Sequence, residues 1–299
     1  MRPSTAIFVL FLAAAPAVAG NLLTNPTLDT DLSGWAYVGA GVWDASDALA
    51  RPNSGSVLAT NNAGTPFTYV SVLISACLPV TPGASYDGSF DYRIPPGQGV
   101  TGVPSLEISW YSGAGCGGGS YLSSSALVDG GTADGVWHRA ESTYAPAAPF
   151  GAVFASLRVN LSKYEAGGTA TAYVDNIVFK PQGTCGSTPD RLCLNNDRFQ
   201  VTSTFLTYAS VSGVGMAQAM TADTGYFWFF SLANVEVVIK VINGCGYNAN
   251  YWIYAGGLTD VYVRLEVKDT RTGVSRIYTN PLATPFHPIG DIGSFPTCP

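Results

Sequence analysis

The chain has 299 residues, of which 47% are hydrophobic and only 11% are charged. This composition predicts packed domains, because disordered chains are richer in charge and poorer in apolar side chains. Lys and Arg number 14 against 20 Asp and Glu, for a formal net charge of -6, and no basic cluster reverses that balance. Nucleic acid and anionic lipid are therefore excluded as expected partners. Only five Glu, four Lys and two His are present, which favours a non-catalytic binding protein over an enzyme.

Residues 1–19 have the pattern of a secretory signal peptide. One Arg precedes an apolar run from Ala6 to Ala15, and Ala17-Val18-Ala19 gives a cleavage pattern of the A-x-A type. The apolar run is shorter than the roughly 20 residues that span a bilayer, and no later stretch is long and apolar enough. We therefore expect a secreted, extracellular protein without membrane insertion.

The remaining chain shows the pattern of an all-β protein. Gly, Pro, Ser, Thr and Asn interrupt it about every 8 to 12 residues, and polar and apolar side chains alternate between the interruptions. The clearest predicted strands are, in chain order, 86–94, 105–111, 153–161, 172–179, 199–205, 235–242 and 261–268, the last forming a hairpin with 274–279. A stretch rich in Pro, Gly, Ser and Thr at 180–189 predicts a boundary near residue 182. The predicted fold is an N-terminal jelly-roll β-sandwich over residues 20–181 and a smaller C-terminal β-sandwich over residues 182–299.

Six cysteines in an exported chain predict up to three disulfides, because export leads to an oxidising compartment. Two cysteines lie in the first half and are expected to pair with each other. In the second half, a bond between the outer pair would tie the two ends of that half together. The predicted pairs are Cys77–Cys116, Cys193–Cys245 and Cys185–Cys298.

Alternation in the predicted strands also indicates a polar sheet surface. If the strands of the first half share one sheet, its exposed face carries Asp91, Arg93, Glu107, Tyr111, Arg158 and Asn160. This combination suits carbohydrate, because sugar C–H faces pack on aromatic rings while sugar hydroxyls bond to planar polar groups. A polar outer face without any ligand is the alternative interpretation.

Glycoside hydrolysis usually requires two carboxylates facing one bond. No close pair of acids stands out in the sequence, so binding is favoured over cleavage. A hydrolase that uses Glu107 with another acid is the less favoured hypothesis.

Three segments of the first half resemble CenC-type carbohydrate-binding modules. Residues 21–35, NLLTNPTLDTDLSGW, resemble the "NLLxNPxFE…W" start of that family. Residues 146–155, PAAPFGAVFA, and 172–179, AYVDNIVF, resemble its "aPaGA" strand and its closing "vDNv" strand. The resemblance covers residues 20–181 and implies a galactose-binding-like jelly roll that binds an extracellular glycan or polysaccharide.

The same resemblance implies roles for individual residues. Many members hold a structural calcium ion where the first and last strands meet, and its oxygen ligands would be Asp29 and Asp175 here. Trp35 would be a core residue. The candidate sugar platforms are Tyr37, Trp43 and Tyr111, and the full expected carbohydrate-binding set is Tyr37, Trp43, Arg93, Glu107, Tyr111 and Arg158.

Residues 182–299 resemble an all-β domain of unknown function found at the C-termini of exported bacterial proteins. The matching segments are 192–199, 224–230, 234–237, 243–246 and 279–282. This resemblance implies an architecture and no activity. The aromatic run 226–230 is predicted to be a strand of the sandwich core rather than a stacking platform.

These observations favour a secreted, non-catalytic protein that binds carbohydrate through its first half. The alternative hypothesis is a structural or adhesive cell-surface or matrix protein that acts through contacts with other surface proteins.

Overall fold

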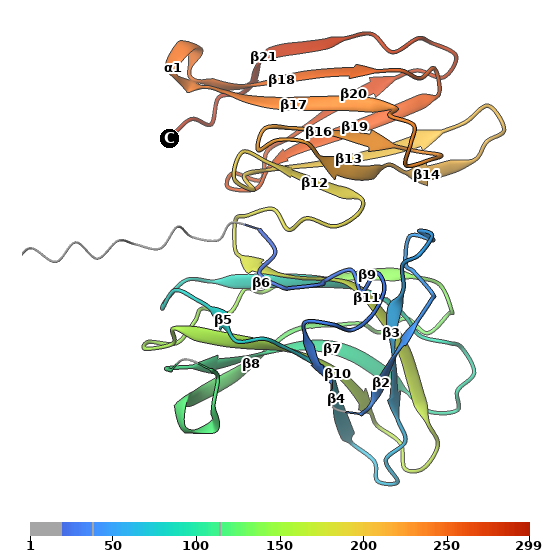
Figure 1. Cartoon of the computed structure of the whole chain (residues 1–299), viewed down its shortest axis with the longest axis vertical. Helices are drawn as coiled ribbons and strands as arrows, with labels where there is room; N and C mark the ends of the chain where they lie inside the picture. Colours follow the sequence, from blue (N-terminus) through green and yellow to red (C-terminus); the bar gives the residue numbers. More distant parts are fainter. Residues whose placement is uncertain (1–19, 38, 114) are drawn as a thin grey trace, which may run out of the picture.

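The computed structural model describes residues 20–37, 39–113 and 115–299, without the side chain of Tyr37. The expected signal peptide, residues 1–19, lies outside the described residues. Within them the chain is almost entirely β-structure with antiparallel strand pairing, as the sequence predicted (Figure 1). The helical elements of this part are the short 3-10 helix η1 (Gly118–Ser120) and α1 (Cys245–Asn248). None of its helices is long and apolar enough to cross a membrane.

Two antiparallel sheets pack face to face in the N-terminal sandwich. Sheet I has the order β1 (Trp35–Tyr37), β4 (Thr68–Ser75), β10 (Phe154–Lys163), β7 (Gly102–Tyr111) and β8 (Tyr121–Asp129), with β5 (Leu78–Pro79) also pairing β10. Sheet II has the order β2 (Gly41–Asp44), β3 (Ser56–Asn61), β11 (Ala170–Pro181), β6 (Tyr86–Arg93) and β9 (His138–Glu141).

The core of this sandwich follows from the alternation along its strands. Leu106, Ile108 and Trp110 of β7 are fully buried and face Phe90 and other apolar side chains of sheet II. Each such side chain contributes about 1.5–3 kcal/mol on burial, and the intervening positions are left for polar groups. Trp35 belongs to the same core, as expected.

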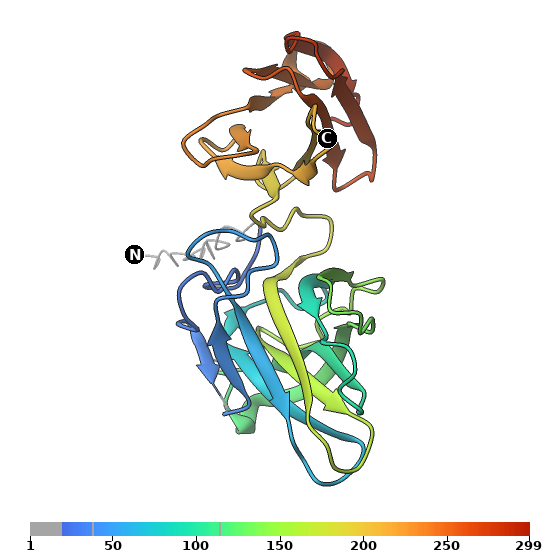
Figure 2. The ribbon, with the colours of Figure 1, turned by 90° about the vertical axis from the view of Figure 1, so that its right-hand side faces the viewer.

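The C-terminal sandwich has its own two sheets and its own core. Sheet III has the order β12 (Arg191–Leu194), β13 (Phe199–Leu206), β19 (Tyr262–Asp269) and β20 (Ser275–Asn280), with β14 (Ser212–Val214) on β13. Sheet IV has the order β15 (Met216–Ala219), β16 (Thr224–Trp228), β17 (Val237–Gly244), β18 (Asn250–Gly257) and β21 (Ile289–Phe295). Figure 2 shows the two sandwiches as separate layered bodies joined by the segment between β11 and β12, where the expected boundary at residue 182 falls.

The aromatic run 226–230 belongs to this second core only in part. Phe227 is fully buried and Phe229 is nearly so, whereas Phe230 is 54% exposed. Phe227 faces the core because side chains alternate along β16. The strand ends at Trp228, so Phe230 lies beyond the sheet.

Three disulfides are present, and two of them differ from the prediction. The pair Cys77–Cys116 is confirmed, but the other bonds are Cys185–Cys193 and Cys245–Cys298. The bond Cys185–Cys193 joins β12 to the segment that precedes it. The second forms because β17 and β21 both flank β18, so the residues that follow them meet beyond one end of sheet IV. Proximity across the sheet therefore determined the pairing, and the expected tie between the two ends of the domain does not form.

Candidate functional site

The residues predicted to form one polar face lie on two different sheets. Glu107, Arg158 and Asn160 are on β7 and β10 of sheet I, whereas Asp91 and Arg93 are on β6 of sheet II. The assumption of a shared sheet is therefore wrong. Alternation determines which way a side chain points relative to its own sheet, but it does not determine which strands become neighbours. Here the chain crosses to the opposite sheet between β6 and β7.

The sheet II candidates are occupied by contacts of their own. The guanidinium of Arg93 lies 4.1 Å from the ring centroid of Tyr173. Asp91 is buried, and its Oδ1 atom accepts a hydrogen bond of 2.7 Å from Nε of Arg139. Arg93 and Asp91 therefore do not belong to the predicted face.

Trp43 is also separated from the predicted face, because β2 belongs to sheet II. Its indole N–H donates to the carbonyl of Leu28 at 2.8 Å, and its ring lies against Gly55, where a Cβ atom would clash. Trp43 therefore fixes the first loop onto the sandwich. The third platform candidate, Tyr37, ends β1, and its side chain lies outside the described residues.

Sheet I does bring the central predicted residues together. Arg158 stands directly opposite Glu107 across the β7–β10 pair, and Asn160 is two residues further along β10. Nδ2 of Asn160 lies 3.4 Å from Oε2 of Glu107, and its Oδ1 accepts a hydrogen bond of 2.9 Å from Ser71 on β4. A carboxylate, a guanidinium and an amide thus form one polar cluster on the outer side of the sheet, in which Asn160 is buried beneath its neighbours.

Aromatic rings lie near both ends of this cluster, although Tyr111 is not the exposed one. Tyr111 is only 5% exposed, because Tyr121 of β8 packs edge-on against it with 5.9 Å between ring centroids. Tyr121 is 49% exposed, and Tyr69 of β4 is 65% exposed. The prediction of Tyr111 as an open platform is therefore wrong, and the exposed ring at this end of the sheet is that of Tyr121.

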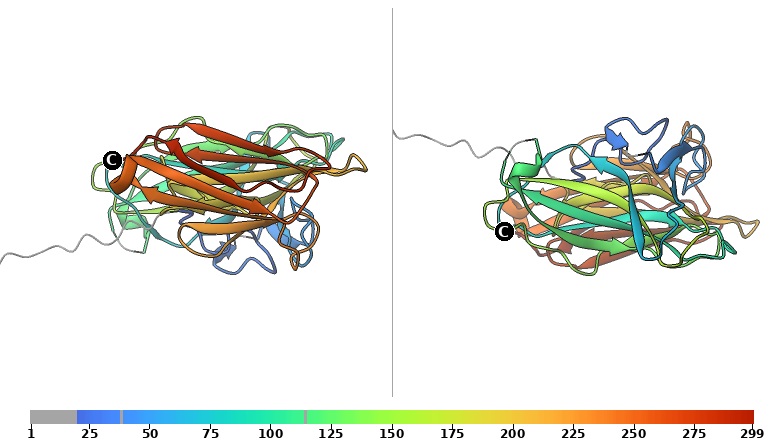
Figure 3. Two further views of the ribbon diagram at one scale, coloured as in Figure 1. Left: turned by 90° about the horizontal axis from the view of Figure 1, so that it is seen from above. Right: turned by 90° about the horizontal axis from the view of Figure 1, so that it is seen from below.

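We call this surface the polar face of sheet I and define it by Tyr69, Ser71, Glu107, Tyr121, Arg158 and Asn160. The right-hand view of Figure 3 shows its strands from below. Tyr69 pairs with Ser162, near one end of β10. Tyr121 pairs with Tyr111, which in turn pairs with Phe154 at the other end of β10. The eight residue steps from 154 to 162 span about 26 Å at roughly 3.3 Å per residue. The face is therefore long enough for a chain of several sugar units.

Arg158 has an unusual environment within this face. Its Nε atom is buried and has no hydrogen-bond partner among the described residues. A buried donor without a partner costs about 1–3 kcal/mol.

Sequence reasoning missed Tyr69, Ser71 and Tyr121. Tyr69 and Ser71 do alternate along β4, but a register shift between Val159 and Asn160 decides that they join the face. A β-bulge of this kind leaves no periodic signal in the sequence.

The expected calcium ligands, Asp29 and Asp175, lie near a cluster of charges. Asp175 is fully buried at the register shift of β11, and its carboxylate accepts hydrogen bonds from the backbone N–H groups of Ala48 (3.0 Å) and Asn176 (2.6 Å). Burial raises the pKa of Asp175 to about 8, with a further contribution from the charge of Asp47. The carboxylate is therefore buried and held by two backbone N–H groups.

Asp29 is bound to an arginine instead. Nη1 of Arg51 lies 3.0 Å from Oδ1 of Asp29, and Nη2 lies 2.8 Å from Oδ2 of Asp47. Ser54 donates to the same oxygen of Asp29 at 2.9 Å. The described residues contain no group of three or more His, Cys, Asp or Glu that could hold a metal. Arg51 thus supplies the positive charge between the exposed carboxylate of Asp29 and the buried carboxylate of Asp47.

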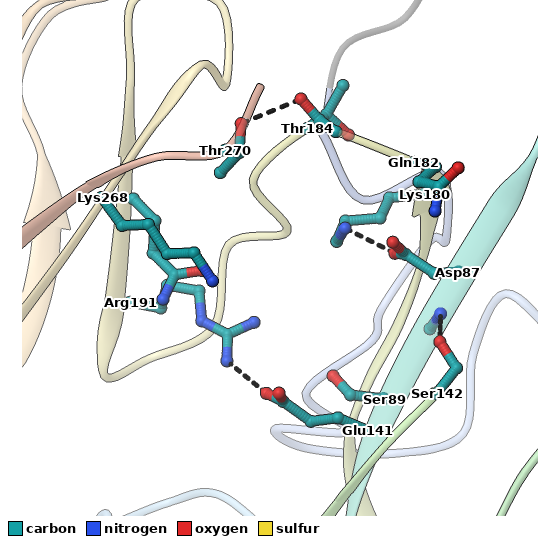
Figure 4. A pocket seen from close by; sticks show the side chains of 13 residues that line it. Asp87, Ser89, Glu141, Ser142, Lys180, Gln182, Thr184, Arg191, Lys268 and Thr270 are labelled. Atoms are coloured by element: carbon teal, nitrogen blue, oxygen red, sulfur yellow. Dashed lines mark hydrogen bonds and ion pairs between the residues drawn. The ribbon is translucent and has the colours of Figure 1, made fainter. Parts of the chain in front are cut away.

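A second candidate site lies between the two sandwiches and was not foreseen from the sequence. We call it the inter-sandwich pocket; its volume is about 260 Å³ (Figure 4). Its charged and amide side chains are Asp87, Glu141, Lys180, Arg191, Gln200 and Lys268. Its residues come from sequence positions about 180 apart, so only the folded arrangement of sheets II and III reveals it.

No family model and no curated protein sequence matches the chain. Among solved structures, it is similar to the enzymatically active domain of tailspike protein 4 of bacteriophage CBA120, with 14% identity over 54% of this chain and 21% of that chain, at a TM-score of 0.38. It is also similar to the CBM22-1–GH10 modules of Clostridium thermocellum endo-1,4-β-D-xylanase 10B complexed with xylohexaose, with 14% identity over 55% and 29% of the two chains, at a TM-score of 0.35.

A third similar structure is TmCBM61 in complex with β-1,4-galactotriose. It shares 15% identity over 54% of this chain and 98% of that chain, at a TM-score of 0.36. The chain thus spans less than a third of the tailspike and xylanase structures but almost all of the TmCBM61 module. At this level of similarity, the candidate sites rest on the residues of this chain alone.

Proposed function

We propose that this is a secreted, non-catalytic protein that binds an extracellular carbohydrate chain on the polar face of sheet I. The observation that carries the proposal is the cluster of Glu107, Arg158 and Asn160 between the exposed rings of Tyr69 and Tyr121. Planar polar groups exchange paired hydrogen bonds with sugar hydroxyls, and exposed tyrosine rings stack on the C–H faces. A sheet surface also keeps these groups in fixed positions, which lowers the entropy cost of binding.

A binding role without catalysis is supported by the surroundings of Glu107. Its cross-strand neighbours are Arg158 on β10 and Ala126 on β8, and neither is an acid. Canonical glycosidases place a second carboxyl group roughly 5–9.5 Å from the first. The polar face therefore offers groups that recognise a sugar, while the usual pair for cleaving the glycosidic bond does not stand across the strands from Glu107.

Secretion is supported by two independent features. The signal-peptide pattern of residues 1–19 predicts export. All six cysteines form disulfides, which persist in oxidising compartments such as the extracellular space.

A glycan array tests this proposal most broadly. The mature chain, residues 20–299, should bind at least one family of oligosaccharides with several sugar units and bind single sugars much more weakly. A blank array from protein with a cooperative unfolding transition would contradict carbohydrate binding.

A specific surface favours a second role in protein contacts. The outer side of sheet IV exposes Val238 and Tyr254, each at 38%, and Ile292 at 54%. Exposed apolar side chains that gather on one sheet are typical of contact surfaces. This role predicts self-association with rising concentration in sedimentation velocity, and a strictly monomeric protein would contradict self-association through this sheet.

A further inference from the structure

The inter-sandwich pocket is built from two rows of outward-pointing side chains. On sheet II, Lys180 stands opposite Asp87 and Ser89 stands opposite Glu141. On sheet III, Gln200 stands opposite Lys268. Figure 4 shows the labelled side chains of the sheet II row across one space from Lys268, with Arg191 reaching from the Lys268 side toward Glu141. Both sandwiches are therefore needed to form the pocket.

The positive charges of the pocket exceed its negative charges. Lys180, Arg191 and Lys268 face only two acids, so the local charge is one positive unit in a chain of net charge -6. Two of the cations are paired: Lys180 Nζ lies 2.5 Å from Asp87, and Arg191 Nη2 lies 3.0 Å from Glu141. Lys268 forms no salt bridge with the residues that the structure describes. This ammonium group is therefore available to an anion.

Arg191 adds a guanidinium to the wall of the pocket. It is only 7% exposed, and its Nη2 atom is held 3.0 Å from Glu141, which fixes its orientation. A guanidinium offers donors in a fixed plane that fit a carboxylate, and a lysine acts as a mobile point charge. The two side chains together can hold one carboxylate from two sides.

The remaining lining favours a ligand rich in hydroxyls. Ser89, Ser142, Thr184, Thr270 and Gln200 supply hydroxyl and amide groups, and large apolar side chains are absent from the residues that line the pocket. The hydroxyls of Thr184 and Thr270 donate to backbone carbonyls, and that of Ser142 accepts from a backbone N–H, so their oxygens can still bond to ligand hydroxyls. A volume of about 260 Å³ lies just below the range usual for drug-sized ligands, which favours a single sugar unit.

We propose that the inter-sandwich pocket binds one carboxylate-bearing sugar unit, a uronic acid, with Lys268 and Arg191 at the carboxylate. The sugar hydroxyls bond to the serine, threonine and glutamine side chains of both sandwiches. This site is separate from the polar face of sheet I and does not depend on the function proposed for that face. Ligand binding would also hold the two sandwiches together, since each supplies part of the site.

The test is an amide chemical-shift titration of the mature chain with D-glucuronate, with D-glucose at the same ionic strength as the matched neutral sugar. The expected result is saturable shifts at Thr184, Gln200 and Lys268 with glucuronate and much smaller shifts with glucose. Lys268→Gln should weaken glucuronate binding at least about fivefold, because a charged hydrogen-bond partner is lost. Lys268→Arg should retain binding.

Lys240→Gln is the matched control, because Lys240 lies on sheet IV and pairs loosely with Asp223 at 3.9 Å. It should bind glucuronate as the wild type does. No saturable shifts at the pocket, equal binding of glucose, or unchanged binding by Lys268→Gln would each overturn the proposal. Equally strong binding of inorganic sulfate would also overturn it, because the pocket would then recognise the charge alone and not a sugar acid.

Discussion

Arg139 and Asp190 form an ion pair across the two sandwiches, with 3.2 Å between Nη1 of the arginine and Oδ2 of the aspartate. The same guanidinium bonds to Asp91 within its own sandwich, and Thr188 donates to Asp190 at 2.6 Å. Burial raises the pKa of Asp190, but the charge of Arg139 and the bond from Thr188 outweigh that effect, and its pKa is lowered. The aspartate is therefore charged at neutral pH and joins the segment before β12 to sheet II.

Asp190→Asn should weaken this connection without leaving a buried charge, because Arg139 keeps its bond to Asp91. The expected loss is about 1–3 kcal/mol in the free energy of unfolding, measured by urea denaturation. Asp260→Asn is the control, since Asp260 only accepts an exposed hydrogen bond from Tyr208. Equal losses from the two substitutions would show that the Arg139–Asp190 ion pair adds nothing to the free energy of unfolding.

A second buried pair predicts the response of the C-terminal sandwich to acid. Asp269 is fully buried, and its carboxylate lies 2.8 Å from Nη2 of Arg198. Burial raises the pKa of Asp269. Hydrogen bonds from Arg198, Thr297 and the backbone of Arg271 lower it by more than burial raises it, so the pKa lies below its usual value. The folded state therefore gains stability above the unfolded pKa of about 3.9 and loses it as the pH falls through the lower folded pKa.

Asp269→Asn should cost about 3–5 kcal/mol at neutral pH, because Arg198 is left buried without its partner. The variant should also lose less additional stability than the wild type as the pH falls below about 4. Urea denaturation at a series of pH values measures both effects. Parallel stability curves for the two proteins over the acid range would contradict this role of Asp269.

The alternation of residues was enough to predict much of the fold. The predicted strands 86–94, 153–161 and 261–268 match β6, β10 and β19 to within about two residues. These strands lie in sandwiches, where one side of each strand is apolar, so the period of two is strong. The inward positions of Leu106, Ile108 and Trp110 were predicted for the same reason and are confirmed.

Relations between distant strands could not be predicted in the same way. Arg93 and Glu107 have matching outward positions, but the chain crosses from sheet II to sheet I between them. The ring of Tyr111 is covered by Tyr121, which follows a glycine-rich loop of irregular path. Both outcomes depend on strand order and loop geometry, which have no periodic signal in the sequence.

The charge cluster around Arg51 predicts how the protein responds to calcium. Because the guanidinium lies between Asp29 and Asp47, adding calcium chloride should leave the unfolding temperature unchanged relative to a chelator. Arg51→Ala should lower the stability, by about 1–3 kcal/mol, because two carboxylates lose their partner. A calcium-dependent rise in the wild-type unfolding temperature would contradict this assignment, since a ligand that binds the folded state stabilises it.

The disulfides should contribute unequally to stability. Cys245–Cys298 closes a loop of 53 residues and Cys185–Cys193 a loop of 8. The chain-entropy relation gives about 4 kcal/mol for the longer loop and about 2.5 kcal/mol for the shorter one. Paired Cys→Ser substitutions compared by urea denaturation test this order. A larger loss from removing the shorter bridge would show that loop entropy does not dominate.

The aromatic ends of the polar face should add to binding without being essential to folding. Tyr121→Ala should weaken binding of an oligosaccharide found on the array by about 1–2 kcal/mol, as expected when a ring that stacks on a sugar is removed. Titration calorimetry measures the loss. Phe150→Ala is a matched control, because Phe150 is fully exposed outside the face. Equal binding by Tyr121→Ala and the wild type would remove Tyr121 from the site.

The most direct test of the polar face is the affinity of Arg158→Gln for the same oligosaccharide, measured by titration calorimetry beside the wild type. Arg264→Gln is the control, since Arg264 lies on sheet III and pairs with Glu266 at 2.9 Å. The account predicts a loss of at least about tenfold for Arg158→Gln, because hydrogen bonds from a charged group are each worth about 1.5–3 kcal/mol, and wild-type affinity for the control. Wild-type affinity in a folded Arg158→Gln variant would contradict binding on the polar face of sheet I.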